Sequence, residues 1–221
     1  MLVHFVKAVQ RMFCQTRLFK NLKSVLRYGH TIRKPSPMDR NEAWHLLNLH
    51  IKNPANIRHA LAVEALMRSL AEKFGADAGQ WGIAGLLHDM DWEETTDQPE
   101  RHTEVAAEIL RAQGCDDAII RAIRAHNYLG TARPHELMDK ALYSTEEMTG
   151  LVTAAVMVLP SRKIADLSVR SIMKKFKEKS FARGVSRAII NETPEMLGLS
   201  VEELAEITLH AMQGVHEQLG I

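Results

Sequence analysis

The chain has 221 residues, a formal net charge of +1, 46% hydrophobic residues and two cysteines, Cys14 and Cys115. That length can bury the core of one domain, and two isolated thiols exclude a disulfide framework or a cysteine-rich zinc site, so we expect a reducing, cytoplasmic compartment. No apolar run reaches the roughly 18 residues that a membrane-spanning helix requires.

Charge is segregated along the chain. Residues 1–38 hold eight Lys/Arg and no Asp/Glu, and residues 161–187 hold nine Lys/Arg against Asp166 and Glu178. The rest of the chain carries 11 Lys/Arg and 25 Asp/Glu, a net charge of −14. The sequence therefore predicts an acidic body with two basic segments.

The first basic segment, residues 1–37, has apolar residues at positions 2, 5, 6, 9, 12 and 13, a spacing typical of an amphipathic helix. Such a segment has features of a transit peptide, and it could also lie on an anionic membrane surface. The interpretation that we favour is a poorly ordered extension, with a Pro-Ser-Pro linker at 35–37. The expected organisation is an extension at 1–37 and one domain at 38–221.

Hydrophobic periodicity and boundary residues predict helices throughout residues 38–221. Asp39 with Glu42, and Ser200 with Glu203, have the spacing of capping boxes. The run from Leu151 to Leu159 is apolar nearly all round, so its helix should be central in the core. No segment predicts a strand, and the expected fold class is all-α, a compact and irregular helical bundle. One expected helix starts at Asp39 and is stopped by Asn53-Pro54, and the others span about 54–73, 78–89, 100–113, 117–127, 135–158, 164–178, 180–191 and 200–219.

A histidine–aspartate pair, His88 and Asp89, follows an apolar run at the expected end of the 78–89 helix. Alone, such a pair is often a surface helix terminus. Further candidate ligands, however, lie on or at the ends of the other apolar-patterned helices. In chain order, the candidate metal ligands are His59, His88, Asp89, His102, His126 and Glu146. Imidazoles and carboxylates without cysteine suit Mn, Fe, Co or Ni, with Mg also possible, better than a structural zinc.

With these residues the sequence resembles the HD-domain superfamily of metal-dependent phosphohydrolases, whose pattern is H…HD…D with two extra histidines in dinuclear members. The phrases LLHDMDW, RHTEVAAEIL and ALYSTEEMTGL are similar to one bacterial and archaeal branch of predicted HD hydrolases, and the resemblance extends over roughly 38–221. The chain departs from the family at the last acid, which is usually Asp. The matching position is Glu146, with Glu147 as the adjacent alternative, and helical spacing alone does not decide between them.

The resemblance implies an HD-type helical bundle and an enzyme. It assigns one ion to His59, His88, Asp89 and Glu146, and a second ion to Asp89, His102 and His126. Two ions about 4 Å apart would bridge a hydroxide and neutralise a phosphoryl group during in-line attack, with Asp89 as the catalytic residue. The expected substrate is a small phosphorylated metabolite, a nucleotide or a phosphomonoester. The alternative is a non-catalytic module that binds a nucleotide or a metal as a sensor.

The second basic segment is the best candidate for contacts with an anionic substrate, because cationic side chains beside a metal site would hold a phosphate. The candidate substrate-binding residues are Arg162, Lys163, Lys174, Lys175, Lys177 and Arg183. A solvated helix face is the alternative for this run of charges. Few aromatic residues accompany the cations, so nucleic acid is a weaker expectation. A third hypothesis is an interaction protein that residues 1–37 bring to a membrane or to RNA.

An acid-rich loop at 90–99 follows the histidine–aspartate pair. For Glu93, Glu94 and Asp97 the interpretation that we favour is simple solvation. For Asp91 two interpretations stay open, solvation and a partner that orients a metal ligand.

Overall fold

The computed structural model of the protein describes residues 38–221, and the predicted N-terminal extension lies outside the described residues. No strand occurs within residues 38–221, and the all-α prediction is confirmed. The helices are α3 (Arg40–His50), α4 (Pro54–Phe74), α5 (Ala78–Leu87), α6 (Trp92–Thr95), α7 (Glu104–Ala112), α8 (Asp117–His126), α9 (Leu137–Met157), the 3-10 turn η2 (Ile164–Asp166), α10 (Val169–Lys177), α11 (Arg187–Ile190), α12 (Thr193–Leu197), α13 (Val201–Gly214) and α14 (His216–Leu219).

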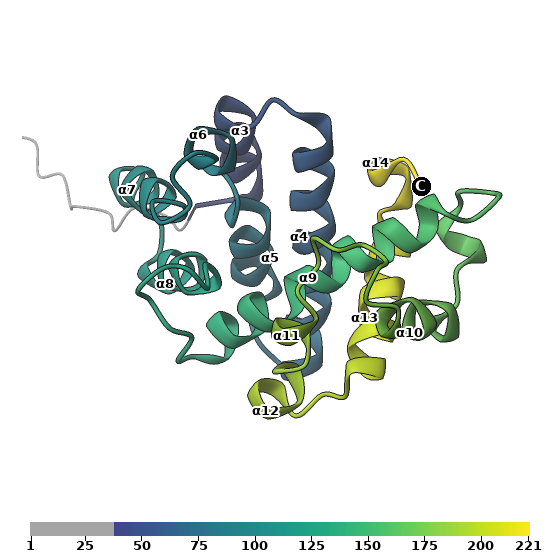
Figure 1. Ribbon diagram of the computed structural model, residues 1–221. Coiled ribbons are helices and arrows are strands. Elements are labelled where there is room, and N and C mark those ends of the chain that lie inside the picture. The colour runs from purple at the N-terminus through teal and green to yellow at the C-terminus, as the bar shows by residue number, and fades with distance from the viewer. Residues whose placement is uncertain (1–37) are drawn as a thin grey trace, which may run out of the picture. The chain divides into compact units, whose positions relative to one another are not determined.

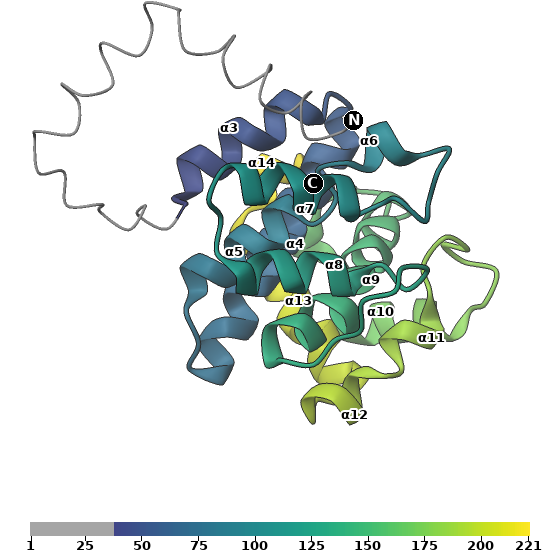
Figure 2. The same cartoon turned by 90° about the vertical axis from the view of Figure 1, so that its left-hand side faces the viewer.

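Helix α9 runs across the middle of the bundle, with α7 and α8 on one side and α10 and α13 on the other (Figure 1). The predicted apolar run at its end supplies fully buried Leu151 and Val152. Turned by 90°, the same fold presents α7 and α8 to the viewer, on the face formed by the central part of the chain (Figure 2). The long helix therefore connects the two sides of the fold, and residues on it can meet residues from both.

Helices α4 and α5 pack together more closely at Gly85 than any side chain at that position would allow. A Cβ atom added at Gly85 would lie 2.7 Å from the carbonyl oxygen of Val63, a contact that real Cβ atoms do not make. Leu66, Leu70 and Leu86 are fully buried beside this contact and supply the apolar area that stabilises the pair. The close approach brings the end of α5 near the start of α4.

The predicted helix starts are largely observed. Both predicted capping boxes, at Asp39 and at Ser200, are present, with the Glu three residues later bonded back to the capping residue. Helix α4 begins with Pro54 after the capping Asn53, and Gly75 ends it in the left-handed conformation with φ of 66°. Within residues 38–221, no helix is both long and apolar enough to cross a lipid bilayer.

The helix predicted at 180–191 is wrong over most of its length. Residues 180–186 form a loop, and only Arg187–Ile190 is helical. The guanidinium of Arg187 donates to the carbonyls of Phe181, Ala182 and Val185 and so holds the loop in place of helical hydrogen bonds. The predicted helix at 200–219 is also divided, at Val215, into α13 and α14.

Candidate metal centre

Five structural elements bring the candidate ligands together. His59 lies in the second turn of α4, His88 directly follows α5, and His126 is the last residue of α8. His102 belongs to the loop before α7, and Glu146 lies on α9. Because helix ends converge here, side chains that are 87 positions apart in the sequence, from His59 to Glu146, face one hollow.

The first group of donors consists of His59, His88 and Asp89, with Glu146 beside them. The Nε2 atoms of His59 and His88 are 3.2 Å apart. Oδ2 of Asp89 lies 3.3 Å from His88 Nε2 and 3.7 Å from His59 Nε2. Oε2 of Glu146 lies 3.6 Å from His59 Nε2, on the side of α9 that faces the group.

The second group consists of Asp89, His102 and His126. Oδ1 of Asp89 lies 3.2 Å from His102 Nε2 and 3.3 Å from His126 Nε2. The two Nε2 atoms are themselves 3.3 Å apart. Asp89 thus directs one carboxylate oxygen to each group and lies between them.

All four histidines use their other ring nitrogen for a hydrogen bond within the protein. Nδ1 of His88 lies 2.8 Å from the carbonyl oxygen of Gly85, and Nδ1 of His126 lies 2.7 Å from that of Ile123. A carbonyl can only accept, so Nδ1 carries the proton in both rings. His102 places Nδ1 2.8 Å from Oδ1 of Asp91, and the same assignment follows. In each neutral ring the Nε2 lone pair then faces the other donors of its group.

His59 is held in the same way by Thr149. The Thr149 hydroxyl donates to the carbonyl oxygen of Glu146 at 2.8 Å, so its oxygen is free to accept from His59 Nδ1 at 3.3 Å. Thr149 and Glu146 share one side of α9 because they are three residues apart. That spacing was readable in the sequence, but nothing there indicated that the hydroxyl meets His59.

The arrangement has the properties of a cation site. Two Nε2 lone pairs that face each other at 3.2–3.3 Å repel unless a proton or a metal ion lies near both. Donors held by one first-row ion at about 2.1 Å lie roughly 3 Å apart when they are neighbours in its shell. Each group of three, His59–His88–Asp89 and Asp89–His102–His126, has its donor atoms within 4.8 Å of one another. The donor set of nitrogen and oxygen therefore fits a divalent metal ion in each group.

The titration behaviour of the metal-free groups follows from the same contacts. Burial acts to raise the pKa of Asp89, but the adjacent His88 and hydrogen bonds from His102 and His126 hold this pKa well below its ordinary value. Burial likewise opposes protonation of His102, yet Asp89 and Asp91 raise its pKa to about 9. Burial and the charge of Glu146 raise the pKa of Glu147 to about 7. A bound cation would replace the protons that these groups now share.

Asp91 is a positioning residue for His102. Its side chain is fully buried; Oδ1 accepts from His102 and Oδ2 accepts from the backbone N–H of Ala106 at 2.9 Å. Thr103, directly after His102, has φ of 73°, a left-handed conformation that costs a β-branched residue roughly 1–3 kcal/mol. The second of the two interpretations of Asp91 is therefore the correct one.

The expectation of simple solvation is wrong for Glu93. Its carboxylate accepts from the backbone N–H groups of Lys52 and Asn53 and from the side chain of Asn56. Hydrogen bonds from Asn53 and Lys52 lower its pKa, and the contact fixes the start of α4 one turn before His59. The acid-rich loop thus supports ligands of both groups.

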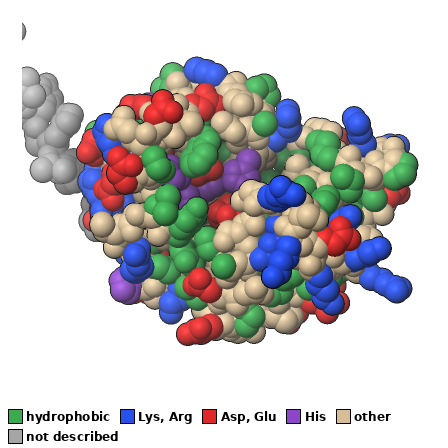
Figure 3. Space-filling view, in the orientation of Figure 1, with side chains coloured by type: hydrophobic (Ala, Val, Ile, Leu, Met, Phe, Trp, Pro, Cys, Tyr) green, Lys and Arg blue, Asp and Glu red, His purple; other side chains and the backbone are tan. Residues whose placement is uncertain are grey.

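A hollow of about 280 Å³ opens above the donors. Figure 3 shows histidine side chains at the bottom of a hollow, with Lys and Arg side chains beside it. Its lining contains the six candidate ligands except His88, together with Trp92, Pro99, Asn127, Tyr128, Leu129, Glu147, Gly150 and Gly184. The predictions from sequence missed the aromatic and amide members of this lining, because no motif indicated them.

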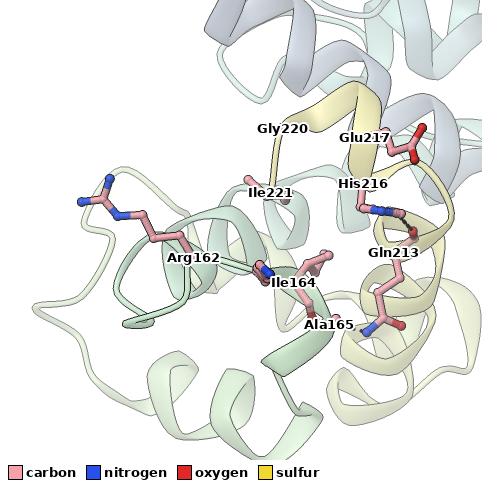
Figure 4. Close-up of a pocket in the computed structure, with 9 residues that line it drawn as sticks. Arg162, Ile164, Ala165, Gln213, His216, Glu217, Gly220 and Ile221 are labelled. Carbon is pink, nitrogen blue, oxygen red and sulfur yellow. Dashed lines mark hydrogen bonds between the residues drawn. The ribbon is translucent and has the colours of Figure 1, made fainter.

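The six predicted substrate-binding cations are dispersed. Arg162 and Lys163 line a different hollow, of about 690 Å³, near α13 and α14 (Figure 4). Lys175 pairs with Glu178 at 2.8 Å and lies over the ring of Phe181, and Lys174 and Lys177 are exposed on the same helix, α10. Arg183 directly precedes Gly184, which lines the hollow above the donors.

The chain is similar in sequence to one protein family and to several curated proteins. Residues 56–158 match the family model of the HD domain. Ribonuclease Y of Aliarcobacter butzleri is 32% identical over 139 residues, which are 53% of this chain and 27% of that protein. Ribonuclease Y of a Sulfurovum species is 26% identical over 136 residues, 60% of this chain and 26% of the relative. The chain thus spans about a quarter of the length of these curated relatives.

Proposed function

We propose that the protein is a metal-dependent phosphohydrolase that attacks a phosphate ester with water, because residues 56–158 match the family model of the HD domain. The proposal rests on the position of Asp89. Its two carboxylate oxygens face two separate groups of histidines, with oxygen to Nε2 distances of 3.2–3.7 Å. A shared carboxylate is what a two-metal hydrolase needs to hold its ions close together.

Each residue of the site has a role in this proposal. When bound, divalent ions would supply an activated water and neutralise charge on the phosphoryl group. His59, His88 and Glu146 would hold one ion, His102 and His126 the other, and Asp89 both. Thr149 and Asp91 hold Nδ1 of His59 and His102 and so direct Nε2 of each ring at the ions.

The expected substrate is a small phosphorylated molecule, a nucleotide or a phosphomonoester. A hollow of about 280 Å³ accommodates part of such a molecule beside the ions. Of the six candidate cations we retain Arg183 for contact with the phosphate, since its neighbour Gly184 lines the hollow. Arg187 supports this role indirectly, because it binds the backbone carbonyls on both sides of Arg183.

The test compares wild-type protein with Asp89→Ala in metal content and in hydrolysis of a panel of phosphate esters. Asp89→Ala should lose both, and the matched control Asp97→Ala, an exposed acid of the same loop, should keep both. Wild-type protein that holds metal but hydrolyses no phosphate ester would favour the sensor alternative. Full metal retention in Asp89→Ala would contradict the site itself.

A second candidate function is cleavage of a phosphodiester in RNA, the class of substrate that the name of the relatives indicates. It is favoured by a second hollow, of about 310 Å³, that shares His59 and Gly150 with the first and is lined by Arg58 and Met157. A phosphodiester has groups on both sides of the reacting phosphorus, and a monoester has a group on one side. Faster cleavage of a short RNA than of a nucleoside monophosphate would establish this second candidate over the first.

A further inference from the structure

Two exposed aromatic side chains border the metal centre. Among residues 38–221, Trp92 and Tyr128 are the only Phe, Tyr or Trp residues that are exposed, at 43% and 56%. Both line the hollow above the candidate ligands. Since exposed aromatic surface has no stabilising role in folding, its concentration at one hollow indicates a binding surface.

Trp92 is fixed in place by the metal centre itself. It begins α6 three residues after Asp89, and its backbone N–H donates to the carbonyl oxygen of Asp89 at 2.9 Å. Its indole meets the ring of His102 edge-on, with centroids 5.2 Å apart and planes at 85°. The ring is therefore held beside a candidate ligand while much of its surface stays open to the hollow.

Tyr128 is positioned through Asn127, which directly follows α8 and its last residue, His126. The buried Asn127 side chain donates to the carbonyl oxygens of Pro99 and His102 at 3.1 and 3.0 Å, and it accepts from the N–H of Leu129 at 3.0 Å. These bonds tie the loop that carries Tyr128 to the loop that carries His102. Both aromatic residues thus belong to segments whose position is set by residues of the candidate metal centre.

The hollow therefore has two chemically distinct parts, a floor of imidazole and carboxylate donors and a wall of Trp92, Pro99, Tyr128 and Leu129. We propose that Trp92 and Tyr128 form a stacking site for the nucleobase of the substrate, next to the phosphate held at the metal centre. This inference rests on the proposed function and names its substrate class, a nucleotide or the end of a nucleic acid strand, as distinct from a sugar phosphate.

Planar rings are the group that this wall recognises best. A nucleobase stacks on the face of Trp or Tyr, and alanine substitution of such a platform typically costs about tenfold or more in affinity per base. The cations of residues 161–187 do not supply these rings, because Trp92 belongs to α6 and Tyr128 to the loop after α8. Because Trp92 and Tyr128 lie outside the basic segment, the composition of that segment did not indicate aromatic stacking.

Binding of adenosine 5′-monophosphate, measured by tryptophan fluorescence and by calorimetry on the metal-loaded protein, tests the inference. Wild type should bind it more than tenfold more tightly than ribose 5-phosphate, which lacks the base, with quenching of fluorescence. In Trp92→Phe the quenching should disappear while most affinity remains, because Trp44 and Trp81 lie outside the lining of the hollow. Trp92→Ala and Tyr128→Ala should each reduce the preference for the nucleotide, and Leu49→Ala, an exposed apolar residue on α3, should not.

Two results would overturn the inference. One is equal affinity of wild type for the nucleotide, ribose 5-phosphate and octyl phosphate, which would show no recognition of a base. The other is an unchanged nucleotide preference in the Trp92→Ala/Tyr128→Ala double variant. These outcomes differ from failure of the proposed function, in which metal-loaded protein hydrolyses no phosphate ester, because a preference for the nucleotide over ribose 5-phosphate does not require that either is hydrolysed.

Discussion

At the scale of single residues, the candidate metal centre depends on which atom of each side chain faces the other donors. Every histidine of the two groups turns Nε2 inward because Nδ1 has a protein acceptor: a carbonyl for His88 and His126, Asp91 for His102 and Thr149 for His59. Such partners fix the orientation of each ring before any ion binds and reduce the entropy lost on binding. The site is thus preorganised by hydrogen bonds that cannot be read from the spacing of the histidines.

Glu146 is the residue at which the chain departs from the family, so its role requires a direct test. We expect Glu146→Gln to weaken metal binding about tenfold or more, because a neutral amide oxygen offsets less of the charge of the cation. Glu146→Asp should be milder, since it keeps the charge. Metal titration of the three proteins, with Glu147→Gln as the control, makes the comparison.

Glu147 is a suitable control because it borders the same hollow, yet Glu146 is the carboxylate that lies 3.6 Å from His59. Loss of metal in Glu147→Gln with retention in Glu146→Gln would show that the ligand is the next residue along α9.

The titration of His102 predicts how the stability of the metal-free protein depends on pH. Its pKa is about 9 in the folded state, above the ordinary 6.5, because Asp89 and Asp91 outweigh burial. A group with a raised folded-state pKa stabilises the fold fully below pH 6.5 and loses that contribution as the pH rises through about 9. Chelator-treated protein should therefore become less stable to denaturant between pH 6.5 and 9, and the affinity for metal should rise over the same range.

The variant His102→Gln is the matched comparison for this effect, since it removes the titrating ring and keeps a polar side chain. Its unfolding midpoint should fall less than that of wild type over the same pH range. Equal changes in the two proteins would assign the pH dependence to other groups.

At the scale of elements, the site is a consequence of how closely helices approach. The absence of a side chain at Gly85 lets α5 approach the Val63 carbonyl on α4, and the Gly85 carbonyl then accepts from His88. The helix starts at Asp39, Asn53 and Ser200 were predictable, because capping chemistry is local and involves residues two or three positions apart. The loop at 180–186 was not, because Arg187 replaces helical bonds with side-chain bonds to carbonyls, which leave no periodic pattern.

Gly85→Ala should destabilise the protein by roughly 1–3 kcal/mol and weaken metal binding, because a Cβ atom at this position forces α4 and α5 apart. Denaturant unfolding and metal titration measure the two effects. Gly214→Ala on α13 is the control, since its Cβ would meet no atom within 4 Å and Ala is the better helix former. If Gly85→Ala matched Gly214→Ala in both measurements, the close packing would not be what positions His88.

At the scale of the whole molecule, α9 joins the donors of α4, α5 and α8 to the part of the chain that carries the basic segment. The structure brings together the six candidate ligands that the order of His, His-Asp, His, His and acid and the resemblance to the HD-domain family indicated. The orienting role of Asp91 was one of two open interpretations, whereas the supporting roles of Asn127 and Thr149 were not predictable, because each acts through a contact between segments 25 to 90 positions apart. The same reason explains why the aromatic wall and the dispersal of the predicted cations emerged from the fold alone.

The central claim is that Asp89 is shared by two metal ions, and the number of ions per chain tests it most directly. Elemental analysis of purified, metal-saturated protein should give two ions per chain in wild type. His126→Ala should give one ion, because it removes a donor from the second group and leaves His59, His88 and Glu146 in place. His210→Ala, an exposed histidine of α13, should still give two. A single ion in wild type and His126→Ala alike, or the loss of all metal in His126→Ala, would contradict the account.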